Sequence, residues 1–159
     1  MDVKEAIKRR YSVRAYSDKD VPRELVNELI EAAELAPSGN NAKPWHFVVV
    51  RSEEQKKLLR ENGIFKQDFV YSAPVIIVCC ADPSAYTKNV SGFDDDNKTR
   101  AIRDLSISSA FLVLRATELG LGTCYIGWVK KEKIKQVLEI EKGYAVPYVI
   151  TVGYANKAS

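Results

Sequence analysis

The sequence has few of the residues on which metal sites, disulfide frameworks and histidine chemistry depend. Its 159 residues include three cysteines and one histidine, with no paired Cys or His spacing typical of zinc or an iron–sulfur cluster. Cys79 and Cys80 are neighbours in an apolar run, so in a strand their side chains would point to opposite faces. We therefore expect no metal and no disulfide framework, but buried, inert thiols in a reducing compartment.

Long apolar runs and a strong charge of one sign are also missing. No run reaches the roughly 18 apolar residues that cross a bilayer. The N-terminus, Met1 to Glu5, is charged and helical in pattern, unlike a signal peptide. The formal net charge of +3 is too small to indicate nucleic-acid binding by itself. These absences predict a cytoplasmic protein that binds neither a membrane nor a nucleic acid.

What is present fits one globular domain over residues 1–159. The apolar share of 46% is ordinary for a folded protein, and a chain of this length can bury roughly two thirds of its unfolded surface. No internal repeat and no linker divides the chain. A stable core is therefore expected.

Hydrophobic periodicity predicts both helices and strands. Helices are expected over residues 2–9, from Pro22 to Pro37, after Ser52, over 99–119 and over 132–138. Strands are expected over 45–50, 75–80, 124–126 and 148–153. The helix over 99–119 is apolar around much of its circumference and should be central, and the polar stretch 82–98 should be a surface loop or mobile lid. The order lacks strict βαβ alternation, which predicts an α+β fold with helices packed around a small mixed sheet.

The first segment that could carry chemistry is basic: residues 9–14 read Arg-Arg-Tyr-Ser-Val-Arg. Guanidinium groups bind phosphate through charge-assisted hydrogen bonds, and a serine hydroxyl adds a donor. Basic residues at a helix C-terminus also complement the helix dipole, by about 0.3–1 kcal/mol each. On this segment alone, phosphate binding and stabilisation of a helix C-terminus are equally good interpretations of the basic residues.

The second segment, residues 36–45, reads Ala-Pro-Ser-Gly-Asn-Asn-Ala-Lys-Pro-Trp. Its small residues and prolines would form a rigid loop whose backbone can approach a ligand closely, and asparagine amides can both donate to and accept from the edge of a heterocycle. The same residues are common in ordinary turns. Taken alone, the composition favours a simple helix-to-strand connector.

The third segment, residues 119–128, reads Leu-Gly-Leu-Gly-Thr-Cys-Tyr-Ile-Gly-Trp. A dinucleotide fingerprint would need a third glycine at Tyr125 and would lead from a strand into a helix, and neither holds here. What remains is a glycine-ended helix that enters a strand whose backbone amides could face a ligand. Helix capping by itself also explains Gly120 and Gly122.

Together, in this order and at these separations, the three segments resemble the FMN-dependent nitroreductase family. The resemblance covers nearly the whole chain and rests on Arg-x-Ser-x-Arg at 10–14, Pro-Ser-Gly-Asn-Asn…Pro-Trp at 37–45, Ala-Pro at 73–74 and Gly-Leu-Gly-x-Cys-x-Ile-Gly at 120–127. It implies a homodimeric nitroreductase-like α+β fold with FMN at the subunit interface. The implied activity is ping-pong hydride transfer from NAD(P)H through the flavin to a nitroaromatic, quinone, enone or flavin.

The resemblance also implies roles for individual residues. Arg10, Tyr11 and Ser12 would hold the FMN phosphate, and Arg14 would reach the N1 and C2 carbonyl edge of the flavin. The loop over FMN bound mainly to the other subunit matches Pro37, Ser38, Gly39 and Asn41. The stretch whose backbone approaches flavin N5 matches Tyr125, Ile126 and Gly127. No catalytic acid–base side chain is expected, because the cofactor carries the hydride chemistry.

Several points stay open in the sequence. Lys43 stands where the family usually has glutamine, and it could pair with a flavin carbonyl or face solvent. The single histidine, His46, is interpreted as structural. Candidates for contact with a nicotinamide 2′-phosphate are Lys66, Lys88, Lys98 and Arg103. Two other functions compete with the enzyme: a flavin-binding protein without turnover, as an electron relay or carrier, and a plain phosphate- or nucleotide-binding module.

Overall fold

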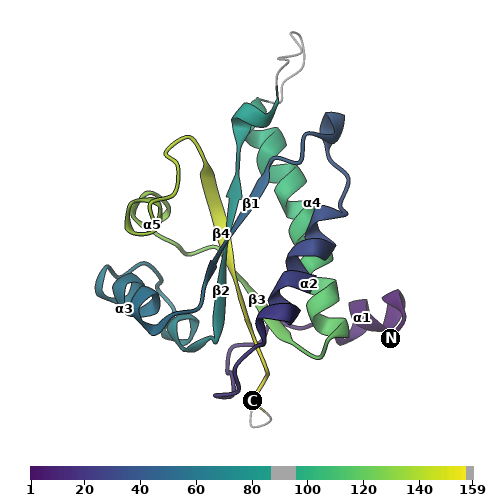
Figure 1. Cartoon of the computed structure of the whole chain (residues 1–159), viewed down its shortest axis with the longest axis vertical. Coiled ribbons are helices and arrows are strands. Elements are labelled where there is room, and N and C mark those ends of the chain that lie inside the picture. Colours follow the sequence, from purple (N-terminus) through teal and green to yellow (C-terminus); the bar gives the residue numbers. More distant parts are fainter. Residues whose placement is uncertain (87–95, 157–159) are drawn as a thin grey trace.

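A four-stranded sheet separates two layers of helices in the computed structural model, which describes residues 1–86 and 96–156 (Figure 1). The strand order is β1-β2-β4-β3. The strands are β1 (Trp45–Val50), β2 (Val75–Ala81), β3 (Gly122–Ile126) and β4 (Ala145–Gly153). Of the stretch 82–98, predicted to be a loop or lid, residues 87–95 lie outside the described residues.

The sheet is antiparallel, so the expectation of a mixed sheet is wrong in this respect. Each neighbouring pair of strands runs antiparallel, and among the described residues the one parallel pairing is a single bridge between Ser12 and Thr123. The continuous apolar run of β2 is fully buried because helices cover both faces of the sheet. Such double burial is typical of parallel sheets, but here it does not depend on parallel neighbours.

The helices form where the sequence predicts them, with local signals at their ends. On one face of the sheet lie α1 (Val3–Arg9), α2 (Arg23–Glu34) and α4 (Asn97–Glu118), and on the other lie α3 (Glu53–Glu61) and α5 (Lys131–Val137). Side chains of Asp2, Ser52 and Asp96 cap α1, α3 and α4 by accepting from backbone N–H groups. Short 3₁₀ turns at 39–41, 68–72 and 83–85 were not predicted.

Two hydrophobic cores lie on the two faces of the sheet. The alternation of β2 places Cys79 in the core beneath α2 and α4, and Cys80 in the core beneath α3 and α5, as predicted. Burial raises the pKa of the Cys79 thiol, and it raises that of Cys80 to about 12. Both thiols are therefore protonated at neutral pH and are poor nucleophiles.

α4 is the central helix. It packs against α2, α1 and all four strands, which confirms its predicted place in the fold. Its apolar residues are not all buried, however: Ile107 and Phe111 are 39% and 40% exposed in the single chain. Among the described residues, no helix has both the length and the apolar character of a membrane span.

Candidate functional site

The first and third segments lie side by side along one edge of the sheet. The basic segment leaves α1 at Arg10, whose backbone N–H donates to Ala6 O at 3.0 Å. It then runs beside β3, where the Val13 N–H donates to Thr123 O at 2.9 Å and Ser12 bridges the same residue. Residues more than a hundred positions apart thus form one continuous surface.

Gly122 makes this close approach possible. A Cβ atom at this position would lie 2.5 Å from Cγ2 of Val13, closer than any van der Waals contact allows. Gly120 has a different role, because its φ of 76° lies in the left-handed region that ends many helices. Helix capping therefore explains Gly120, whereas Gly122 is explained by the packing of Val13.

The side chains of the basic segment are available to a ligand. Arg10, Tyr11 and Arg14 are exposed and Ser12 is half-buried. Arg14 Nη1 donates to Ser12 O at 3.3 Å, whereas the Arg10 guanidinium forms no hydrogen bond or ion pair with other described residues. Two guanidinium groups and a hydroxyl within five residues make a donor set suited to a phosphate.

Tyr125, Ile126 and Gly127 play three different parts at the end of β3. The Ile126 side chain is buried in the core beneath α5, so only its backbone can serve a ligand. Tyr125 is exposed, and a Cβ atom at Gly127 would have no neighbour within 4 Å. The backbone at Gly127 is therefore accessible from outside.

A hydroxyl network holds Tyr125 in place. Its phenol lies 3.0 Å from Ser109 Oγ, which lies 2.8 Å from the Tyr148 hydroxyl, and the two aromatic rings meet edge to face at 5.2 Å between centroids. Burial raises the pKa of both phenols, while the Arg10 charge acts in the opposite direction on the pKa of Tyr125. Both hydroxyls are protonated at neutral pH and can donate hydrogen bonds.

The second segment, residues 36–45, lies away from the other two segments in the folded chain. The Gly39 N–H donates to Asp104 Oδ2 at 2.7 Å, which attaches the loop to the N-terminal half of α4. Asp104 is buried and also accepts from the Tyr86 hydroxyl. The basic segment lies toward the opposite end of the molecule (Figure 1). One chain therefore brings two of the three predicted segments together, but not Pro37, Ser38, Gly39 and Asn41.

The loop has an unusual backbone. Asn40, Asn41 and Lys43 have φ values of 57°, 52° and 45°, in the left-handed region that costs about 1–2 kcal/mol for most residues. Ser38 Oγ accepts from the Lys43 N–H at 2.9 Å, and Lys43 Nζ donates to Glu34 O at 2.9 Å. The Lys43 ammonium is thus bound next to its own loop.

Replacing Asp104 with alanine is expected to lower the free energy of unfolding by about 1–3 kcal/mol, because the Tyr86 hydroxyl and the Gly39 N–H lose their acceptor. Urea unfolding would measure this loss. Asp68 is a matched control, since its ion pair with Arg60 is exposed and its replacement should cost less than about 1 kcal/mol. Equal losses for the two variants would contradict the anchoring role of Asp104.

Sequence reasoning missed Asp104, Ser109 and Tyr148. A signal for the first two was present, because they are polar residues in a helix predicted to be central and buried polar groups are nearly always hydrogen-bonded. Their partners could not be predicted, since they lie in distant parts of the sequence. His46 stacks on Tyr144 with centroids 4.7 Å apart, and the described residues form no group of three or more possible metal ligands.

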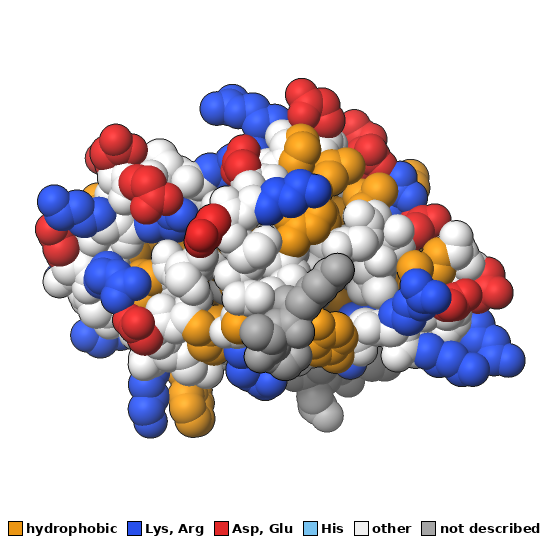
Figure 2. Space-filling model, turned by 90° about the horizontal axis from the view of Figure 1, so that it is seen from below, with side chains coloured by type: hydrophobic (Ala, Val, Ile, Leu, Met, Phe, Trp, Pro, Cys, Tyr) orange, Lys and Arg blue, Asp and Glu red, His pale blue; other side chains and the backbone are white. Residues whose placement is uncertain are grey.

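One face of the molecule carries charge of both signs. Figure 2 shows basic and acidic side chains interspersed over one face, without a continuous basic stripe. A nucleic-acid footprint would require clustered basic side chains. The basic segment at Arg10 is thus better suited to a small anion.

Solved structures share this fold. A nitroreductase family protein from Clostridium novyi NT aligns with a TM-score of 0.86 and 29% identity, over 99% of this chain and 87% of that one. An FMN-dependent nitroreductase from Clostridium difficile R20291 aligns with a TM-score of 0.78 and 29% identity, over 96% of this chain and 87% of that one. The architecture is the predicted nitroreductase-like α+β fold.

The sequence itself leads to the same family. The model of the nitroreductase family matches residues 7–64 and 63–154. A relative from Methanothermobacter thermautotrophicus, provisionally named NADH dehydrogenase/NAD(P)H nitroreductase, is 36% identical over 97% of this chain and 78% of its own length. The chain belongs to the nitroreductase family, as the sequence predicted.

Proposed function

We propose that this chain is an FMN-dependent oxidoreductase that passes hydride from NAD(P)H to a small acceptor. The proposal rests on one observation at the edge of the sheet. The segment with the donors Arg10, Ser12 and Arg14 lies beside β3, and the backbone at Gly127, just beyond the end of this strand, is accessible. The relatives named for NAD(P)H and FMN support it. Residues 1–159 would act as one domain.

The residues present fit FMN. Arg10 and Ser12, with Tyr11 between them, would bind the phosphate, and the guanidinium of Arg10, which has no partner within residues 1–86 and 96–156, is suited to that role. Gly127 is four residues beyond Thr123, the bridge partner of Ser12, and a strand rises about 3.3 Å per residue. The phosphate end and the exposed backbone are therefore separated along the edge, with room for the ribityl chain. Arg14 would face the pyrimidine edge of the flavin.

When bound, FMN supplies the hydride chemistry. The chain's own residues would bind and orient it. Tyr125 and Tyr148 keep their protons at neutral pH, because the ordinary pKa of a phenol is about 10 and burial raises the pKa of both further. They would therefore add hydroxyl donors beside the flavin without adding negative charge.

The homodimer is the second part of the proposal. The loop with Pro37, Ser38, Gly39 and Asn41 is bound to α4 away from the basic segment of its own chain, so a second copy is needed to place it over the flavin. Exposed apolar side chains are available for such an interface: Val3 and Ile7 on α1, and Ile107 and Phe111 on α4. α1 packs on α4, and apolar surface of this kind commonly marks an association site.

Replacing Phe111 with glutamate is expected to weaken the dimer by about thirtyfold or more, the effect of losing a central apolar contact. Because the loop then no longer reaches the partner's flavin, FMN affinity should fall as well. Sedimentation measures the first effect and flavin fluorescence the second. Leu58→Glu is the control, since Leu58 is equally exposed but lies on α3, in the other helical layer. An FMN-loaded wild-type monomer would contradict the dimer.

Turnover distinguishes the enzyme from its alternatives. Purified protein loaded with FMN should oxidise reduced nicotinamide rapidly when a quinone or nitroaromatic is present. Bound FMN without turnover would instead indicate an electron relay or flavin carrier, and failure to bind FMN would favour a phosphate-binding module. We also propose a cytoplasmic location, which suits three buried cysteines with free thiols.

A further inference from the structure

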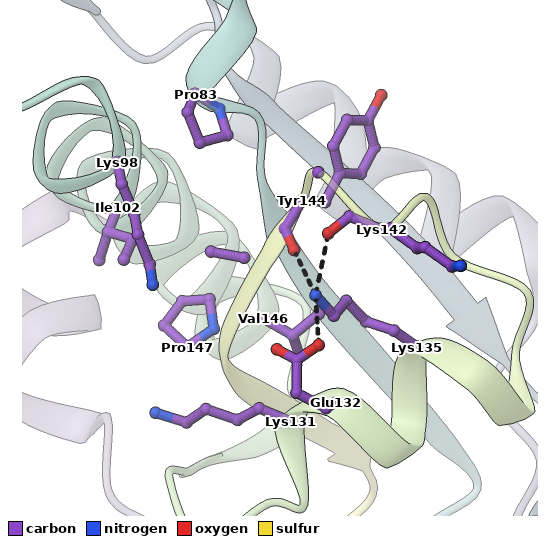
Figure 3. A pocket seen from close by; sticks show the side chains of 12 residues that line it. Pro83, Lys98, Ile102, Lys131, Glu132, Lys135, Lys142, Tyr144, Val146 and Pro147 are labelled. Carbon is purple, nitrogen blue, oxygen red and sulfur yellow. Dashed lines mark hydrogen bonds and ion pairs between the residues drawn. The ribbon is translucent and has the colours of Figure 1, made fainter.

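A cavity of about 380 Å³ lies beyond the end of β3. It is bounded by the first turns of α4, the start of α5 and the first residues of β4 (Figure 3). β4 extends past β3, whose last residue pairs with Val149, so in the described part of the chain no strand pairs on this side with the β4 residues before that position. Ile102 and Pro147 contribute apolar surface to the lining.

Two ammonium groups in this cavity form no hydrogen bond or ion pair with the residues that the structure describes. Figure 3 shows Lys98 from α4 and Lys131 from α5 reaching toward Pro147 from two sides. The Lys98 charge contributes to lowering the pKa of Asp96, the N-cap residue of α4, but the Asp96 side chain is bound to the Thr99 N–H. Lys142 also lines the cavity but points away from it in Figure 3. The apolar floor is therefore flanked by two positive charges.

Lys135 differs from Lys98 and Lys131 because its ammonium group is already bound by other residues of the chain. Its Nζ donates to the carbonyl oxygens of Lys142 and Tyr144, both at 3.1 Å, and pairs with Glu132 at 2.9 Å. These three interactions satisfy an ammonium group completely. Lys135 thus stabilises the wall of the cavity, while Lys98 and Lys131 remain available to an anion.

One face of α4 connects the cavity to the proposed flavin site. Lys98, Ile102, Ser106 and Ser109 follow at spacings of four, four and three residues, which places them along the same side of a helix. Ser106 and Ser109 contact the Tyr148 hydroxyl at 3.5 and 2.8 Å, and Ser109 contacts Tyr125. A ligand could therefore extend from Tyr125 to Lys98 without crossing the core.

The short stretch of chain between Gly127 and Lys131 limits the distance from the proposed flavin site to the cavity. Lys131 is four residues after Gly127, so their Cα atoms are at most about 14 Å apart. A dinucleotide, whose two nucleosides are joined through a pyrophosphate, can span such a gap. With its nicotinamide near Gly127, its adenosine half would come to the cavity.

We propose that this cavity binds the 2′-phosphate of NADPH, so that the chain prefers NADPH to NADH. The inference rests on the proposed function. A phosphate monoester carries close to two negative charges at neutral pH, which matches the ammonium groups of Lys98 and Lys131, and the adenosine can pack on Ile102 and Pro147. NADH has an uncharged hydroxyl at the same position, which offers neither lysine an ion pair.

The other candidates from the sequence are less suited to this role. Lys66 lies over the Trp128 ring at 4.5 Å, and Arg103 is near the buried carboxylate of Asp104, at 3.8 Å. Lys88 lies outside the described residues. Of these candidates, Lys98 lines the cavity. Lys131 of α5 lines it as well, although the sequence did not single it out.

Calorimetry with nucleotide fragments tests the site independently of turnover. We expect the FMN-loaded protein to bind 2′,5′-ADP at least tenfold more tightly than 5′-AMP. Lys98→Gln and Lys131→Gln should each weaken 2′,5′-ADP binding by about tenfold, the effect of one charge-assisted contact, and leave 5′-AMP unchanged. Lys133→Gln is the matched control, because Lys133 is exposed on α5 and does not line the cavity.

Steady-state kinetics give the second readout. In both cavity variants kcat/KM should fall about tenfold for NADPH and stay constant for NADH, with FMN content unchanged. Equal affinity for the two fragments, or variants that behave like Lys133→Gln, would overturn the proposal. Rapid turnover with both donors but no preference would refute the cavity while leaving the proposed function intact. Protein that binds no FMN yet retains the lysine-dependent preference for 2′,5′-ADP would refute the function alone.

Discussion

Replacing Arg10 with alanine is expected to raise the dissociation constant of FMN by about 10- to 100-fold, because a charge-assisted hydrogen bond contributes roughly 1.5–3 kcal/mol. The effect should be large because the Arg10 guanidinium forms no hydrogen bond or ion pair with the described residues and therefore breaks none of these when it binds a phosphate. Flavin fluorescence titration of the purified variant measures the change. Stability in urea should stay close to that of the wild type.

Arg9 is a close control for this experiment. It is the adjacent arginine, but its guanidinium pairs with Glu5 at 2.7 Å on the exposed side of α1. Arg9→Ala should change the FMN dissociation constant by less than about twofold, since exposed ion pairs contribute little. If both variants bound FMN equally well, the phosphate would have to lie elsewhere.

Gly122→Ala is expected to lower the free energy of unfolding by about 1–3 kcal/mol, the usual cost of overpacking a core position. The new methyl group would overlap Val13, which is fully buried and whose β-branched side chain has little freedom to rotate. Val13 can move only with its backbone, so the basic segment should shift away from β3. FMN affinity is therefore expected to fall together with stability.

A double variant tests this mechanism. Val13→Ala removes the methyl groups that the Gly122→Ala side chain would meet, so the two changes together should destabilise less than the sum of the single changes. Gly143→Ala is the control, because a Cβ atom at Gly143 would meet nothing within 4 Å. Additive losses for Gly122→Ala and Val13→Ala would show that the clash is not the cause.

The positions of helices and strands could be predicted because their signals are local. β1 begins and ends where the sequence predicts, between Pro44 and Arg51, and α3 begins after Ser52, whose side chain caps it. Strand direction is not a local property. The all-apolar run of β2 indicates burial on both faces, and an antiparallel sheet between two helical layers satisfies that as well as a parallel one.

The site was predictable in its segments but not in its assembly. The basic segment and the end of β3 were identified from composition and resemblance, yet their contact depends on Gly122, for which helix capping was an equally good explanation. The roles of Asp104 and Lys131 depend on tertiary packing, because their neighbours in the fold lie far away in the sequence. The apolar circumference of α4 predicted a central helix, but the exposed Phe111 shows that part of this pattern needs a different explanation, which the proposed dimer supplies.

The most direct test of the central claim is a visible absorption spectrum of the protein after incubation with FMN and removal of the free flavin by gel filtration. We expect a yellow dimer that retains an FMN for each chain, and Arg10→Ala protein that loses the colour on the column. Wild-type protein that leaves the column colourless would contradict it, because the fold would then be present without a working flavin site.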